Sequence, residues 1–152
     1  MPEAPTAAEA REAFHRHLVE KAGSARLRHG LLVDEAAIRR ILGDRDVLRF
    51  PVELAFDAGP LEPGEFAFPQ PLGERPADGF RLCVHPLFRG VPDAVPMLAA
   101  YHIPTINYGE IVGPAEAELF GAALVGMPPD EYYSALCELA DMLEDGEVPA
   151  RE

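Results

Sequence analysis

The chain has 152 residues, of which 48% are hydrophobic, 13 are Lys or Arg and 26 are Asp or Glu, so its formal net charge is −13. This hydrophobic content excludes a disordered chain, and the acidic balance argues against nucleic acid and anionic membranes, which attract clusters of Lys and Arg. The length is typical of one domain. We therefore expect a single domain over 1–152, with disordered tails at 1–5 and 145–152.

Several features of the sequence predict a cytoplasmic protein. The N-terminal stretch MPEAPTAAEAREAF has no apolar segment like that of a signal peptide. No apolar run reaches the roughly 18 residues that a membrane-spanning helix requires. The two cysteines, Cys83 and Cys137, lie far apart and match no metal-binding or redox motif. Both are expected to be buried thiols in a reducing compartment.

Two helices are predicted in the N-terminal third. Thr6 begins a T-x-x-E capping box, which predicts a helix to about Ala22 with Gly23 as its stop. Asp34 has the character of a second N-cap, and it predicts a helix that ends at Gly43.

Three strands are predicted in the middle of the chain, at about 47–57, 65–69 and 80–85. In the first of them, large apolar side chains occupy every second position, at Phe50, Val52, Leu54 and Phe56. This alternation gives one buried face and one wet face, which is typical of antiparallel sheets. We therefore expect a small antiparallel three-stranded sheet.

Three more helices are predicted in the C-terminal half. The first begins at Asp93 and meets Pro104, after which the chain continues either as a kinked helix to Gly109, which the spacing favours, or as a strand. The other two are predicted over 114–125 and 130–144. Because strands gather in the middle and helices at the ends, the sequence predicts an α+β fold.

No phosphate-binding loop, dinucleotide fingerprint, zinc-protease motif or nucleophile elbow is present in the sequence. The best candidate cleft instead combines His85, His102, Tyr108 and Glu110, with Cys83 nearby. His85 ends a predicted strand and His102 lies on a predicted helix, so both side chains can overhang one cleft.

Two readings of these residues remain open. Imidazole and carboxylate are common ligands of zinc and iron, so His85, His102 and Glu110 are candidates for a single transition-metal site, or for acid–base chemistry with Tyr108. Alternatively, His85 only caps a strand beside Pro86, and His102 is a half-buried residue bonded to a backbone carbonyl.

The order of elements also resembles the layout of minimal zincin-like domains over about half of the chain. The stretch that corresponds to their HExxH motif is His102-Ile103-Pro104-Thr105-Ile106. It lacks the second His and the Glu, so this resemblance implies a related scaffold without that activity.

Tyr132 and Tyr133 lie on the last predicted helix about 100° apart, so at least one is expected to pack in the core. Alternatively, the pair contributes to a homodimer interface, where tyrosine is favoured, so both are candidate interface residues. The leading hypothesis is a non-catalytic interaction or accessory protein that acts through protein contacts as a homo-oligomer. The alternative is a metal-binding protein or metal-dependent, hydrolase-like enzyme that uses His85, His102 and Glu110.

Overall fold

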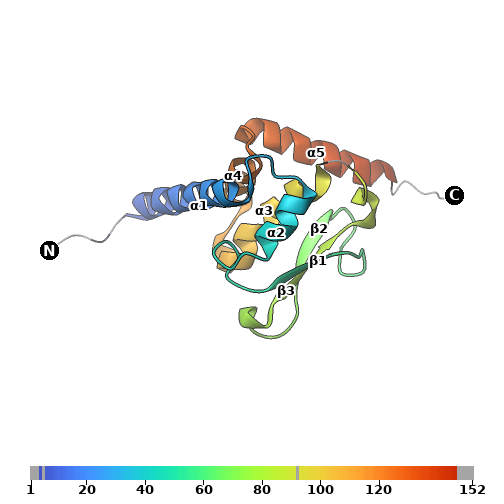
Figure 1. The fold of residues 1–152 in the computed structure, drawn as a ribbon, viewed down its shortest axis with the longest axis horizontal. Coiled ribbons are helices and arrows are strands. Elements are labelled where there is room, and N and C mark those ends of the chain that lie inside the picture. Colours follow the sequence, from blue (N-terminus) through green and yellow to red (C-terminus); the bar gives the residue numbers. More distant parts are fainter. Residues whose placement is uncertain (1–3, 5, 92, 147–152) are drawn as a thin grey trace.

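The computed structural model describes residue 4, residues 6–91 and residues 93–146. It is an α+β structure of five α-helices and a three-stranded sheet within these residues, as predicted (Figure 1). The predicted N-terminal tail and residues 147–152 lie almost entirely outside the described part. Asp145 and Gly146 belong to the last helix.

The first helix, α1 (Ala7–His29), is longer than predicted. Its capping box is present, since the Thr6 backbone N–H donates to Glu9 Oε1 at 2.8 Å and the Glu9 N–H donates to Thr6 Oγ1 at 3.0 Å. The helix continues through Gly23 and ends at Gly30, whose φ of 110° suits glycine. Ala22 and Ala25 are buried on both sides of Gly23, so packing outweighs the weak helix propensity of this residue.

The second helix, α2 (Glu35–Leu42), has the predicted ends. The Ala37 N–H donates to Asp34 Oδ1 at 2.9 Å, which satisfies one of the free donors at the helix start. Ile38, Ile41 and Leu42 face inward and are buried.

The sheet contains β1 (Val52–Phe56), β2 (Ala67–Pro71) and β3 (Phe80–Val84) in the order β1-β3-β2. The expectation of a purely antiparallel sheet is wrong, because β1 pairs with β3 in parallel while β2 pairs with β3 antiparallel. The chain reverses direction between consecutive strands as a meander does. However, β3 inserts between the first two strands, which the alternation of side chains could not reveal.

Strand β2 contains Pro69 and Pro71, which lack the N–H that a central strand would need. The flanking ladder bonds run from the His85 N–H to the Phe66 carbonyl and from the Leu72 N–H to the Gly79 carbonyl. Because bonding residues alternate in an antiparallel pair, both prolines fall on the positions that face the open edge.

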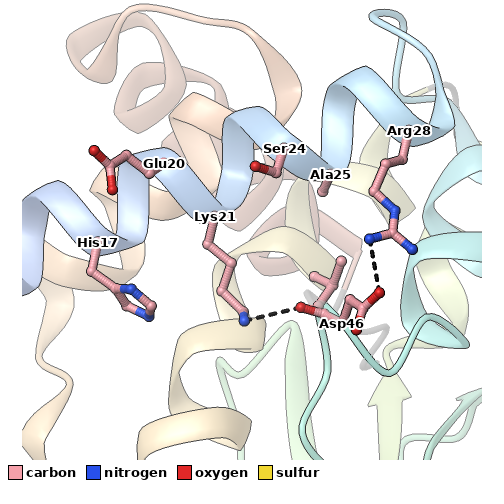
Figure 2. A pocket seen from close by; sticks show the side chains of 8 residues that line it. His17, Glu20, Lys21, Ser24, Ala25, Arg28 and Asp46 are labelled. Atoms are coloured by element: carbon pink, nitrogen blue, oxygen red, sulfur yellow. Dashed lines mark hydrogen bonds and ion pairs between the residues drawn. The ribbon is translucent and has the colours of Figure 1, made fainter.

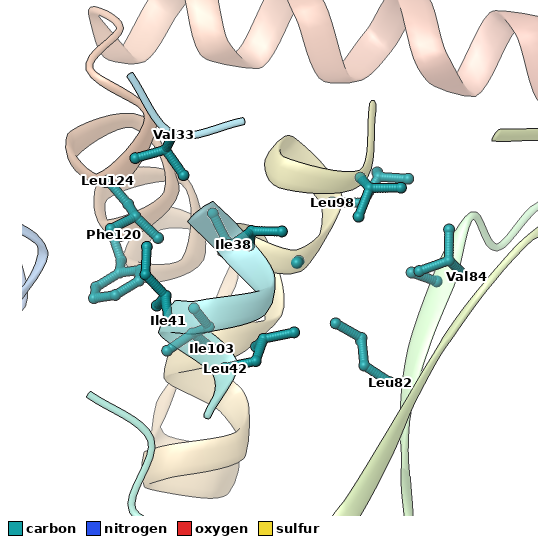
Figure 3. Packing of buried hydrophobic residues seen from close by; sticks show 14 of the residues in the cluster. Val33, Ile38, Ile41, Leu42, Leu82, Val84, Leu98, Ile103, Phe120 and Leu124 are labelled. Atoms are coloured by element: carbon teal, nitrogen blue, oxygen red, sulfur yellow. The ribbon is translucent and has the colours of Figure 1, made fainter. Parts of the chain in front are cut away.

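Three helices complete the fold, namely α3 (Ala94–Tyr108), α4 (Pro114–Val125) and α5 (Pro129–Gly146). Short 3-10 helices lie at Pro76–Asp78, Pro86–Phe88 and Gly109–Ile111. Helix α3 packs against α4 on one side and against the sheet on another, so it lies at the centre of the core. Figure 3 shows Leu98 and Ile103 of α3 in the cluster that includes Leu82 and Val84 of β3.

Helix α3 continues through Pro104, so the reading of 103–108 as helix is correct. An internal proline costs a helix about 3 kcal/mol because it removes one backbone hydrogen bond and crowds the preceding turn. Ile103, Pro104 and Ile106 are all buried, and their burial offsets this cost.

None of the helices in the described part of the chain is long and apolar enough to cross a membrane.

Helices α3, α4 and α5 meet at Tyr132. This side chain is fully buried, and its hydroxyl donates a hydrogen bond to the Met97 carbonyl at 2.7 Å. Its ring lies directly over Gly121 of α4, where a Cβ atom would overlap the ring. The absence of a side chain at Gly121 therefore sets how closely α4 and α5 approach.

We expect Gly121→Ala to lower the free energy of unfolding by about 1–3 kcal/mol, because the added methyl group overlaps a buried ring. Gly23→Ala is the matched control, since a Cβ there has nothing within 4 Å and the position is helical. This control should gain about 0.5–1 kcal/mol. Urea denaturation measures both values, and equal effects of the two substitutions would contradict this account.

Candidate functional site

A large apolar cavity lies between the end of α3 and the edge of the sheet where β2 ends and β3 begins. Its volume is about 640 Å³. We call it the aromatic groove. Its apolar lining includes Phe50, Phe68, Pro69, Pro71, Phe80 and Ile106. Five polar side chains also line it, those of Arg49, Thr105, Asn107, Tyr108 and Glu110.

Arg49 is held in the aromatic groove by Asn107 of α3. The Arg49 backbone N–H donates to Asn107 Oδ1 at 2.8 Å, and Arg49 Nη1 donates to the Asn107 carbonyl at 3.0 Å. Asn107 also donates through Nδ2 to the Val47 carbonyl at 2.8 Å. Asn107 is only 3% exposed and is the one buried polar residue among those described. These bonds attach the chain before β1 to the C-terminal end of α3.

Aromatic rings flank the Arg49 guanidinium. Its central carbon lies 5.5 Å from the centre of the Phe50 ring and 5.8 Å from the centre of the Tyr108 ring, within the range of cation–π attraction. The Tyr108 hydroxyl is hydrogen-bonded to His17 Nε2 of α1 at 2.7 Å. Burial raises the pKa of Tyr108, and the nearby charge of Arg49 partly opposes this shift.

Two of the five residues of the predicted cleft, Tyr108 and Glu110, therefore line one cavity. Cys83 lies elsewhere, buried in β3, with its Sγ 3.8 Å from Gln70 Oε1. Burial raises the pKa of its thiol. The expectation that Cys137 is also buried is wrong, because this residue of α5 is exposed. His85 follows the last residue of β3, whereas the groove meets the first residue, Phe80. The His85 imidazole accepts the Leu87 N–H through Nδ1 at 3.1 Å and so caps the short 3-10 helix Pro86–Phe88 rather than the strand.

His102 belongs to α3 and lies beside two aromatic rings, one from α3 and one from the segment before β2. The centre of its imidazole lies 5.3 Å from the ring centre of Tyr101 and 6.4 Å from that of Phe66. Its Nε2 atom is buried and has no hydrogen-bond partner among the described residues. Removal from water disfavours the charged imidazolium and lowers the pKa of His102 from 6.5 to about 4.

Within the described ranges, no three His, Cys, Asp or Glu side chains lie close enough together to hold a metal ion. The described residues therefore contain no cluster of ligands that supports a transition-metal site at His85, His102 and Glu110. That hypothesis stays a prediction, and the metal content of the purified protein would test it.

A second pocket, of about 340 Å³, lies beside α1, where Lys21 and Arg28 lean toward Asp46 (Figure 2). Lys21 Nζ donates to the Asp46 carbonyl at 3.0 Å, and Arg28 Nη1 lies 2.9 Å from Asp46 Oδ2. These contacts join α1 to the loop before β1. Because both cations already have partners, less of their charge is available to a ligand.

The two tyrosines of α5 have different environments. Tyr132 is buried in the core, whereas Tyr133 is 53% exposed. Of the predicted interface pair, only Tyr133 is available to a partner.

Exposed leucine side chains are found where α1 ends and the loop to α2 begins. Leu27, Leu31 and Leu32 are 81%, 62% and 82% exposed, and we call them the leucine face. Next to Leu32 is a hollow of about 360 Å³. We call it the methionine hollow. Its lining includes Val33, Pro96, Met97, Val125 and Met127.

A scan against models of known protein families finds no match to this chain, and neither do searches of curated proteins and of solved structures. The functional argument therefore rests on the geometry of the sites themselves.

Arg49, Asn107 and the leucine face were not among the residues predicted from the sequence. Arg49 lies before β1 and Asn107 lies on α3, so only the folded chain brings them together. The Leu31-Leu32 pair is visible in the sequence, but only the structure shows that both side chains are exposed while Val33 beside them is buried.

We expect the unfolding free energy to fall as pH decreases from 6.5 to 4, because His102 is buried in its neutral form. In that window the unfolded chain binds a proton that the folded chain does not. The contribution of His102 to stability is therefore fully present above pH 6.5 and is lost progressively toward pH 4. The loss should approach about 3 kcal/mol, and His102→Phe should remove it. Denaturant titrations at a series of pH values measure the effect.

The carboxyl groups of Asp44 and Glu116 affect stability in a separate, lower range of pH. Hydrogen bonds from His29 and His15 lower the pKa values of Asp44 and Glu116, so their contribution is lost only as pH falls below the ordinary carboxyl range. If the unfolding free energy of His102→Phe still falls by the same amount between pH 6.5 and 4, the assignment to His102 is wrong.

We expect Asn107→Ala to lower the free energy of unfolding by about 2–4 kcal/mol, because it leaves the Val47 carbonyl and the Arg49 N–H without partners. Asn107→Asp is the informative companion, since its oxygen still accepts from the Arg49 N–H but cannot donate to Val47. Its loss should be at least as large at neutral pH, because a carboxylate buried against the Val47 carbonyl is costly. Chemical denaturation compares the two variants, and a near-zero loss in Asn107→Ala would show that this residue does not hold the two segments together.

Proposed function

We propose that the protein is a non-catalytic interaction protein that self-associates through the leucine face. The observation that carries the proposal is the exposure of three large apolar side chains within six consecutive positions, 27–32. Single exposed leucines are ordinary on protein surfaces, but a group of them beside an apolar hollow is typical of an interaction site.

The second copy of the chain is the partner that fits this surface best. Leu32 stands 82% exposed at the rim of the methionine hollow, so one surface carries both a protruding apolar side chain and a recess that can receive one. Such a surface is self-complementary, which is what a two-fold symmetric interface requires. Methionine side chains adapt to an inserted leucine because they are flexible and polarisable.

Burial of these leucines would contribute a free energy of the same order as the cost of association. Burying a leucine side chain is worth about 1.5–3 kcal/mol, so six leucines in a symmetric pair give about 9–18 kcal/mol. Association costs about 4–15 kcal/mol in lost freedom of motion. The gain and the cost are comparable, so the stability of such a dimer would depend directly on these side chains.

The distribution of charge also favours this surface. Residues 1–49, which contain the leucine face, carry nine basic against eight acidic residues, whereas residues 50–152 carry four against eighteen. The leucine face therefore belongs to the less acidic part of a chain whose net charge is −13, which reduces repulsion between two copies there. Added salt screens the remaining repulsion and should strengthen the dimer.

Sedimentation velocity over a concentration series tests the proposal. We expect a dimer for the natural chain and a monomer for the double variant Leu31→Asp with Leu32→Asp, since each introduced carboxylate would have to be buried at the interface. Leu72→Asp is the matched control, because Leu72 is also exposed, at 48%, but lies between β2 and β3. This control should remain dimeric.

The double variant should unfold within about 0.5 kcal/mol of the natural chain, because both residues are exposed. A monomeric natural chain at all accessible concentrations would refute the proposal. A dimer that survives the double substitution would place the interface elsewhere, with Tyr133 as the next residue to change.

A further inference from the structure

We propose that the aromatic groove binds a small organic acid, with a single carboxylate that pairs with Arg49 and an apolar body that fills the groove. This inference is independent of self-association. The leucine face belongs to the end of α1 and its following loop, and none of its residues lines the aromatic groove.

The charge of Arg49 has no acidic partner in the described part of the chain. Arginine carries five N–H donors, and one of them is used by the Asn107 carbonyl. None of the ion pairs between described residues includes Arg49. The remaining donors form a planar fork that matches the two oxygens of a carboxylate.

The guanidinium is positioned in advance of binding. Asn107 holds both the backbone and the side chain of Arg49, and the rings of Phe50 and Tyr108 lie against it. A side chain already held in place loses little freedom when a ligand arrives, so more of the interaction energy appears as affinity. The Asn107 carbonyl lies at the C-terminal end of α3, where the helix dipole also favours a cation.

The remainder of the groove selects the body of the ligand. A volume of about 640 Å³ is within the roughly 300–1,000 Å³ of typical small-molecule sites, and phenylalanine and proline side chains dominate the lining. Such walls favour an aromatic or aliphatic group over a sugar or a peptide backbone, whose polar atoms would lose water without replacement. Glu110 also lines the groove, and its carboxylate disfavours a second negative charge on the ligand.

Titration of the isotope-labelled full chain by nuclear magnetic resonance tests the proposal, with phenylpropanoate as the probe and the neutral phenylpropanamide as its matched control. We expect the acid to shift the amide signals of groove residues such as Phe80 and Ile106. The acid should bind at least about tenfold more tightly than the amide, because a charged hydrogen-bonded pair is lost with the amide.

Two variants assign the charge. Arg49→Gln should weaken binding of phenylpropanoate by about tenfold or more and weaken binding of the amide much less, because the amide carries no charge to pair with Arg49. Arg39→Gln is the control for loss of a positive charge, since Arg39 pairs with Glu35 on α2 and does not line the groove. Glu110→Gln should tighten binding of the acid, because it removes a like charge from the lining.

Several outcomes would overturn the proposal. They are the absence of binding by the acid, equal affinity for acid and amide, an unchanged affinity in Arg49→Gln, and signal shifts confined to residues outside the groove. Tighter binding by an apolar peptide with a free C-terminal carboxylate than by phenylpropanoate would also overturn it, since the groove would then recognise a polypeptide end.

Discussion

The hydrogen bonds of Asn107 are the constraint on which the site depends. This residue is nearly inaccessible to water, and it joins the end of α3 to the segment that leads into β1. A buried amide must find partners for its donors and acceptors, so its position leaves the Val47–Arg49 segment little freedom. The same bonds that anchor the chain also direct the Arg49 guanidinium toward the rings of Phe50 and Tyr108. The hydrogen bonds of Asn107 therefore contribute both to the stability of the fold and to the position of Arg49 in the groove.

The core around α3 explains why this anchor can exist. Helix α3 is covered by α4 on one side and by the sheet on another, and its apolar side chains extend the buried cluster from Phe120 to Val84 (Figure 3). Tyr132 extends the same packing to α5 through its contact with Gly121 and its bond to the Met97 carbonyl. A helix held on several sides tolerates Pro104 and carries His102 in an apolar environment, where the imidazole stays neutral.

The two surfaces proposed for function have different physical characters. The leucine face offers exposed apolar area and a recess beside it, which suits a partner whose surface is also apolar. The aromatic groove offers one positioned cation within apolar walls, which suits a small ligand with one charge. Because the two surfaces share no residues, the two proposed activities would not compete with each other.

Local patterns in the sequence determined most of the secondary structure. Capping residues at Thr6 and Asp34, proline at position 114 and the alternation in 50–56 each report on neighbours within a few positions, and the corresponding elements are present. The tertiary structure decided what depends on distant contacts. Packing of Ala22 and Ala25 carried α1 through Gly23, and the insertion of β3 made the sheet mixed. The grouping of Tyr108 and Glu110 with Arg49, and the separation of His85 from that groove, likewise follow from how α3 lies on the sheet. A pattern along the chain records which face of an element is buried, whereas the partner that buries it is chosen only when the whole core packs.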